Sequence, residues 1–185
     1  PEATWQRCIV HVKRDVLAGI EGKERQARAR AVMAPVFKES DPALVRALYH
    51  RAVDELAAFA PRAAAVLEEA EVDALAYLSF PRAHRVKVRT NNVQERSNLE
   101  LKRRAKVVQA FPSTGSVMRL LGAVAGEMDA DWASGNAFMS PTSLRPVLGM
   151  ERAENRIEEF APDEETMANA RVIMAVALDA YGKAA

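Results

Sequence analysis

The chain has 185 residues, of which 49% are hydrophobic and 28% are charged, and its formal net charge at pH 7 is +1. This balance is typical of a folded globular protein and excludes disordered, collagen-like and low-complexity classes. No apolar run approaches the roughly 20 residues that a membrane-spanning helix needs, so we expect a soluble protein. The single cysteine and the lack of a secretory leader pattern favour a reducing compartment, and Pro1 in place of Met suggests a fragment or a processed chain.

Charge is unevenly distributed along the sequence. Residues 82–106 carry nine basic side chains and two acids, whereas residues 151–165 carry seven acids and two basic side chains. The first segment could bind phosphate, and the second would repel it.

The first half of the chain predicts helices after one short extended segment. Residues 4–12 are rich in β-branched and aromatic types, which predicts a short strand or the strand-to-helix entry of an α/β unit. Helix-like spacing of apolar residues then predicts an all-helical block over residues 14–80. Within it, Ser40-Asp41-Pro42 combines a capping residue with a proline in the first turn, so a long helix should begin there and end near Ala60-Pro61.

The second half predicts three further helices. Residues 85–89 alternate basic and apolar types, which favours an extended conformation. A basic helix is predicted over about 93–108, and an apolar helix over 116–128 follows a break at Phe111-Pro112-Ser113. After a proline-punctuated linker and the acidic stretch, a last helix is predicted over about 164–180.

Three polar side chains share one face of the predicted basic helix. Glu95, Asn98 and Lys102 lie in a row at helical spacing. A carboxylate at a helix start, flanked by arginines, could bind Mg²⁺ while the arginines hold DNA phosphates. A first-turn glutamate stabilised by the helix dipole, with solvated basic neighbours, explains the same residues without a metal. Both hypotheses stay open on the residues alone.

Cys8 and His11 form a C-x-x-H pair that could contribute to a zinc site. Zinc normally takes three or four protein ligands at paired spacings, and the only other histidines are His50 and His84. A packed cysteine with a hydrogen-bonded histidine is therefore favoured over a self-contained zinc site. No glycine-rich phosphate loop or nucleophile elbow is present in the sequence.

Two segments carry long patterns. Residues 5–12 are W-Q-R-C-I-V-H-V, residues 89–104 are R-T-N-N-V-Q-E-R-S-N-L-E-L-K-R-R, and F-P-S follows at 111–113. In this order they resemble the W-Q-R-C-x-V-H-F, R-T-T-N-x-I-E-R-L-N-x-E-I-K-R-R and F-P-N segments of Mutator-type transposases from the bacterial insertion-sequence branch. The resemblance spans about residues 3–138. Among its departures, Gln109-Ala110 stands where the family usually has Gly and an apolar residue, and Ser97 stands where it prefers Leu.

The resemblance implies a fold. The chain, itself mostly α, would be the C-terminal part of an α/β RNase H-like catalytic domain of the DDE type with an all-helical insertion. Glu95 would complete the metal-binding triad, Cys8, His11 and Asn98 would be supportive signature residues, and both catalytic aspartates would lie upstream of Pro1. The implied segments are the end of the first part of the core (1–13), the all-helical insertion (14–84), the return to the core with the catalytic-glutamate helix (85–138) and an acidic tail with a final helix (139–185).

The resemblance also implies a function. A cut-and-paste or copy-type DNA transposase would cleave phosphodiester bonds and transfer strands at the ends of a mobile element, with Mg²⁺ or Mn²⁺. DNA and further copies of the chain are the expected partners, in the bacterial cytoplasm, and this fragment alone is expected to be inactive. The alternative is a catalytically inactive remnant or a helical interaction module that lacks the two aspartates. The candidate DNA-backbone contacts are Arg89, Arg96, Lys102, Arg103 and Arg104.

Overall fold

The computed structural model of the chain describes residues 5–135, 138–148 and 156–184. They belong to two compact units, Pro1–Thr90 with Pro146–Ala185, and Asn91–Arg145. The described residues form helices and turns and contain no strand, which confirms the prediction of a mostly helical chain. The helices of the first unit are α1 (Ile9–Ala18), α2 (Lys23–Met33), α3 (Pro42–Ala57), α4 (Pro61–Glu69), α5 (Glu71–Leu75), η1 (Ala76–Ser79), α6 (Arg82–Val88), η2 (Ile157–Phe160) and α10 (Glu164–Ala184).

The first helix replaces the strand predicted near the start of the sequence. Residues 5–8 have no regular structure, α1 begins at Ile9, and Thr4 lies outside the described residues. Ile9, Val12 and Val16 are buried at spacings of three and four residues, so the β-branched run presents one apolar face of a helix to the core. The prediction of a short strand over 4–12 is therefore wrong for the residues from Ile9 onward, and of the alternative, a strand-to-helix entry, the described residues show the helix but not the strand.

The segment predicted to be extended near residue 85 is also helical. It lies in α6, which follows Pro81. His84 is buried and Val88, one turn later, is half-buried against the core, so the two share the inner face. The alternation of basic and apolar residues over 85–89 is thus a consequence of a short helix with a solvated outer face, and the prediction of an extended segment is wrong.

The helix predicted from its capping signal is confirmed as α3. The Asp41 side chain accepts a hydrogen bond from the backbone N–H of Leu44 at 2.9 Å, and Pro42 occupies the first turn. The helix ends at Ala57, ahead of the proline that opens α4. Its buried side chains are those of Val45, Ala47, Leu48, Tyr49, Ala52 and Leu56.

Tyr49 joins three parts of the core. Its hydroxyl donates a hydrogen bond to the carbonyl of Leu67 at 2.5 Å, which links α3 to α4. Its ring meets that of Phe37 edge to face, with centroids 6.4 Å apart. The turn after α2 is thereby packed against the middle of α3.

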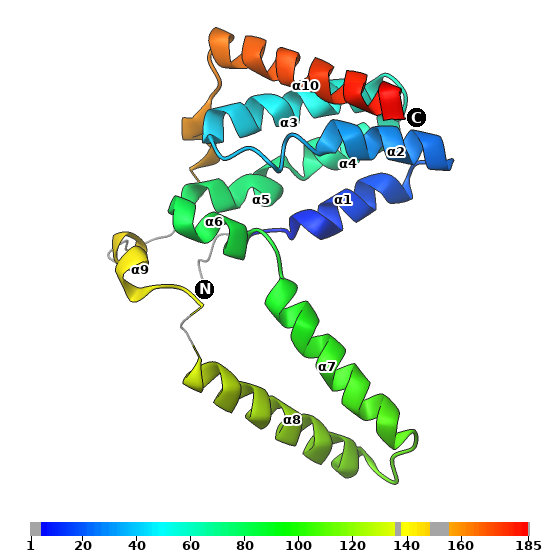
Figure 1. The fold of residues 1–185 in the computed structure, drawn as a ribbon, viewed down its shortest axis with the longest axis vertical. Coiled ribbons are helices and arrows are strands. Elements are labelled where there is room, and N and C mark those ends of the chain that lie inside the picture. Colours follow the sequence, from blue (N-terminus) through cyan, green and yellow to red (C-terminus); the bar gives the residue numbers. More distant parts are fainter. Residues whose placement is uncertain (1–4, 136–137, 149–155, 185) are drawn as a thin grey trace. The chain divides into compact units, whose positions relative to one another are not determined.

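The final helix of the chain is part of the same core. Figure 1 shows α10 alongside α3, and it also contacts α2. Ala170 and Met174 of α10 are fully buried with the side chains of the N-terminal helices. Tyr181, near its C-terminal end, donates a hydrogen bond to the Glu24 carbonyl at 3.1 Å. The helix predicted over about 164–180 is therefore confirmed and extends to Ala184.

The second unit is a pair of helices joined by a short loop. α7 (Asn92–Val108) and α8 (Thr114–Ser134) contact each other, and α9 (Pro141–Leu148) follows. Ser113 caps α8 by accepting a hydrogen bond from the backbone N–H of Ser116 at 3.2 Å. α7 has no buried side chain and α8 has one, that of Val124. This hairpin therefore has little core of its own.

Candidate functional site

The segment in front of α1 is anchored by the side chain of Gln6. Its amide oxygen accepts a hydrogen bond from the backbone N–H of Tyr77 at 2.6 Å, and its amide nitrogen donates to the carbonyl of Ala74 at 3.1 Å. The backbone N–H of Ile9 donates to the carbonyl of Arg89 at 3.1 Å. Residues about 70 positions later thus fix the start of α1, a structural role for the W-Q-R-C segment that the local sequence does not reveal.

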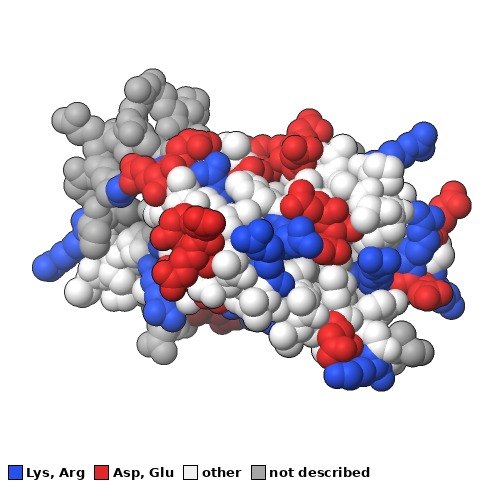
Figure 2. All heavy atoms as spheres, turned by 90° about the horizontal axis from the view of Figure 1, so that it is seen from above, with Lys and Arg blue, Asp and Glu red and all other residues white. Residues whose placement is uncertain are grey.

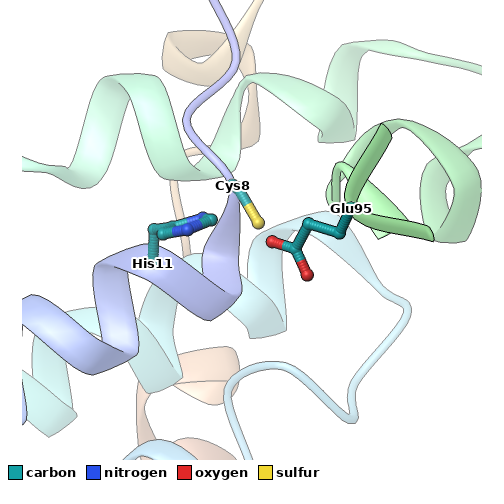
Figure 3. Close-up of side chains that lie close together, drawn as sticks. All are labelled: Cys8, His11 and Glu95. Atoms are coloured by element: carbon teal, nitrogen blue, oxygen red, sulfur yellow. The ribbon is translucent and has the colours of Figure 1, made fainter. Parts of the chain in front are cut away.

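Cys8 and His11 lie together at the N-terminal end of α1. Cys8 is the residue that precedes the helix, His11 belongs to its first turn, and both are half-buried. Their ligand atoms, the Cys8 sulfur and a His11 ring nitrogen, lie within 4.8 Å of each other (Figure 3). The first unit therefore supplies one sulfur and one nitrogen donor at this point, short of the three or four ligands of a zinc site.

Glu95, also drawn in Figure 3, belongs to the second unit. It lies in the first turn of α7, where its backbone N–H donates to the carbonyl of Asn91 at 2.9 Å. Its side chain is exposed, as are those of Asn98 and Lys102. The N-terminal end of a helix carries a partial positive charge that attracts anionic groups. The structure thus places a negative charge, an amide and an ammonium group along one helix.

Two of the basic residues predicted to bind DNA form ion pairs along α7 and α8. The Arg103 guanidinium binds the Glu100 carboxylate at 2.7 Å, and Arg104 binds the same carboxylate at 2.9 Å and Glu127 at 3.3 Å. Hydrogen bonds from Arg103 and then from Arg104 lower the pKa of Glu100 to about 2. Glu100 therefore stays ionised and offsets part of the positive charge, a pairing that the spacings of three and four residues could have indicated.

The other three basic candidates differ from one another. Arg96 and Lys102 are exposed on α7, and the described part of the chain offers neither an ion-pair partner. Arg89 is half-buried in the first unit, where its guanidinium donates to the carbonyl of Phe37 at 3.0 Å and lies 5.9 Å from the ring centre of Tyr77. Arg89 therefore supports the packing of the first unit whatever else it binds. The assignment of all five basic residues to DNA stays a prediction.

Basic and acidic side chains are mixed on one face of the molecular surface. On the face drawn in Figure 2, the described basic and acidic side chains alternate and do not gather into a single basic field. Within the described residues, no helix is both long enough and apolar enough to cross a bilayer.

Comparison with known proteins identifies one family. Residues 1–135 match the sequence model of the family described as "Transposase, Mutator family". No solved structure matches the chain.

Similar transposases occur in several bacteria. The chain is 34% identical over 166 residues to the transposase for insertion sequence element IS1081 of Mycobacterium tuberculosis, which covers 90% of this chain and 39% of that protein. It is 32% identical over 140 residues to the transposase for IS406 of Burkholderia multivorans, covering 76% of this chain and 36% of that protein. A transposase for IS256 in transposon Tn4001 of Staphylococcus aureus is 31% identical over 70% of this chain and 33% of its own length. The chain thus spans less than two fifths of the length of these relatives.

Proposed function

The chain belongs to the Mutator family of transposases, and on that premise we propose that it acts as the C-terminal part of an enzyme that cleaves and joins DNA phosphodiester bonds at the ends of a mobile element. The observation that carries the proposal is the position of Glu95, an exposed carboxylate at the positive end of a basic helix. It occupies the glutamate of the motif that resembles the family's metal-binding segment. The two aspartates and the RNase H-like core would come from the part of the relatives that this chain does not span.

The chemistry of the side chains decides which of them suits Mg²⁺ or Mn²⁺. The carboxylate oxygens of Glu95 are the donors that these ions prefer. Cys8 and His11 offer sulfur and nitrogen, which these ions do not prefer, so we assign the pair a supportive role at the start of α1. Two such ions, held by three carboxylates, would supply activation of the attacking hydroxyl and charge stabilisation of the leaving oxygen in an in-line displacement. Glu95 supplies one of those carboxylates.

The basic side chains of α7 then hold the DNA backbone. Arg96 and Lys102 are available for direct contact with phosphates. Arg103 and Arg104 can exchange the carboxylate of Glu100 for a phosphate, since both anions accept bidentate hydrogen bonds from guanidinium groups. Such contacts give affinity and salt dependence without reading the base sequence. Further copies of the chain in the active complex are part of the same proposal.

A chimera provides the test of the catalytic role. The preceding part of the Mycobacterium tuberculosis relative is joined to this chain, and Mg²⁺-dependent cleavage of element-end DNA is measured with and without Glu95→Gln. We expect cleavage to fall by at least about a thousandfold, because one metal-binding carboxylate is lost while size and shape are kept. DNA binding should be unchanged.

The matched control is Glu165→Gln, an exposed glutamate in the first turn of α10. It removes the same charge from the same kind of position and should leave cleavage intact. If Glu95→Gln cleaves as fast as the unmodified chimera, Glu95 is not a metal ligand. If the unmodified chimera binds DNA but never cleaves it, the chain is a catalytically inactive remnant.

A further inference from the structure

Two cationic side chains of the first unit contact Phe37 in the turn that follows α2, and a third cation is the next residue of that turn. The Lys13 ammonium, from α1, lies 4.5 Å from the ring centre of Phe37. The Arg89 guanidinium, which follows α6, donates to the Phe37 carbonyl at 3.0 Å. Lys38 is the next residue in the chain and its side chain is exposed. We call Lys13, Lys38 and Arg89 the Phe37 cation cluster.

The cluster has no acidic partner among the described residues. None of the ion pairs found among the described residues of the first unit includes a member of the cluster. These pairs join Arg7 to Asp15, Arg46 to Glu71 and Glu158, His50 to Glu71, Arg51 to Asp54 and Glu55, Arg156 to Glu159, and Lys183 to Asp179.

The charged groups around the cluster are also mostly paired with one another and not with the cluster. Burial, followed by the charges of Arg89 and Lys38, lowers the pKa of Lys13, so the three cations are close enough for their charges to interact. The nearby basic residues Arg82 and Arg85, by contrast, lie close enough to Glu39 and Asp41 to interact with their charges. The three cations at Phe37 therefore form no ion pair with the described residues, and the nearby carboxylates of Glu39 and Asp41 interact instead with Arg82 and Arg85.

We propose that Lys13, Lys38 and Arg89 form a binding site for backbone phosphates of DNA, carried by the first unit independently of the basic residues of α7. Three cations that meet from separate segments suit a dense anion with several acceptor oxygens, because each cation can donate to a different oxygen. Aligned contacts of this kind fix the position of the duplex without reading its sequence. The proposal rests on the proposed function for the choice of DNA as the anion.

The test is the salt dependence of DNA binding by the 185-residue chain. Binding to a fluorescent duplex of arbitrary sequence is measured in EDTA at several salt concentrations for the unmodified chain and for Lys13→Gln/Lys38→Gln. Each lost phosphate contact should reduce the slope of log K against log salt by about 0.9 and weaken binding about eightfold at 0.1 M salt. The double variant should therefore lose about 1.8 in slope.

The matched control is Lys23→Gln, an exposed lysine at the start of α2 in the same unit. It removes one charge without touching the cluster and should leave the slope unchanged. Lys13→Arg/Lys38→Arg keeps both charges and should bind as the unmodified chain does. The melting temperature of each variant, followed by circular dichroism, shows that a loss of binding does not reflect unfolding.

The outcomes separate this site from the catalytic proposal. An unchanged slope in the double glutamine variant, or an equal loss in Lys23→Gln, overturns the site. Displacement of the duplex by polyglutamate at equal charge concentration would mean that the cluster takes acidic protein segments, and this also overturns it. Because binding is measured in EDTA, failure of Glu95 as a metal ligand does not alter these results.

Discussion

The Arg46 guanidinium binds the Glu71 carboxylate at 2.9 Å, and this pair connects three segments of the first unit. Arg46 also binds Glu158 at 3.2 Å and donates to the carbonyl of Ile157 at 3.2 Å. The ring of His50 lies 2.8 Å from the same Glu71 oxygen. Through these contacts one residue of α3 ties α5 to η2, the segment that leads into α10, and its side chain is only 12% exposed.

Loss of the Arg46 guanidinium should destabilise the first unit. Arg46→Met keeps the aliphatic stem but leaves the Glu71 carboxylate without one of its two partners in a largely buried position. We expect the free energy of unfolding in urea to fall by about 1–3 kcal/mol. Lys183→Met removes an exposed partner of Asp179 and should change the free energy of unfolding by less than about 0.5 kcal/mol. Equal effects of the two variants would contradict this account.

Glu71 should make the stability depend on pH. Burial raises the pKa of Glu71, but hydrogen bonds and charges from His50 and Arg46 outweigh burial and leave the pKa below its ordinary value of 4.5. A pKa lowered by folding means that ionised Glu71 contributes stability above about pH 4.5, which is lost as the pH falls through the folded-state pKa. Glu71→Gln should therefore be less stable than the unmodified chain at pH 7.

The difference in unfolding free energy between the unmodified chain and Glu71→Gln should shrink as the pH falls below about 4.5. Urea unfolding at pH 7, 5 and 3 measures it. Glu69→Gln, at an exposed position at the end of α4, controls for the loss of one negative charge. A difference for Glu71→Gln that stays constant from pH 7 to pH 3 is the result that this explanation does not allow.

The α7–α8 hairpin should exchange its amide protons faster than the first unit. Val124 is its single buried side chain, whereas α3 alone buries six. Local opening costs less where few apolar contacts must be broken. We expect protection factors in α7 and α8 at least tenfold below those in α3, measured by hydrogen exchange with mass spectrometry. Equal protection would show that the hairpin has stabilising contacts beyond its own two helices.

Gln109→Gly should stabilise the second unit. Gln109 has φ 60° and ψ −53°, and the backbone N–H of Ala110 donates to the Val108 carbonyl at 2.7 Å, which together form a strained type of γ-turn. Glycine relieves roughly 1–2 kcal/mol of strain and costs about 0.4–1 kcal/mol through its freer unfolded chain. The expected net gain is up to about 1.6 kcal/mol, observed as slower amide exchange in α7 and α8. Gln109→Ala keeps the strain and should show no gain.

Glu100→Gln should strengthen DNA binding if Arg103 and Arg104 contact phosphates. Both guanidinium groups now bind the Glu100 carboxylate, which competes with the DNA backbone. With that competitor neutralised, the slope of log K against log salt should steepen by up to about 1.8. Glu68→Gln, at an exposed position in α4, controls for net charge. Equal slopes for the two variants would assign these arginines to the helix surface alone.

Local signals predicted the elements that depend on neighbours in sequence. The Asp41 cap and Pro42 define the start of α3 because a helix start is decided within one turn. The segment from Ile9 differs from the strand prediction because its β-branched residues favour a strand locally, whereas the core that holds them in a helix is built from later helices. The bond between Arg46 and Glu158 joins residues 112 positions apart, a distance at which no local pattern is informative.

The candidate site was predictable to a similar degree. The position of Glu95 in the first turn of a basic helix follows from its motif and is found in α7. The ion pairs of Glu100 follow from helical spacing and could have been predicted. The Phe37 cation cluster could not, because Lys13, Lys38 and Arg89 come from three separate segments of the chain that only the folded unit brings together.

The burial of Ala170 and Met174 in a core shared with the first helices has a genetic consequence. A premature stop codon or a frameshift ahead of α10 would act like a deletion from the middle of the domain, because the apolar face of α3 would lose its cover. Such a truncated product would unfold more often and be removed by cellular proteases. Copies of the gene that are interrupted ahead of the codons for α10 are therefore expected to be silenced at the level of protein abundance, even where every codon for the residues around Glu95 is intact.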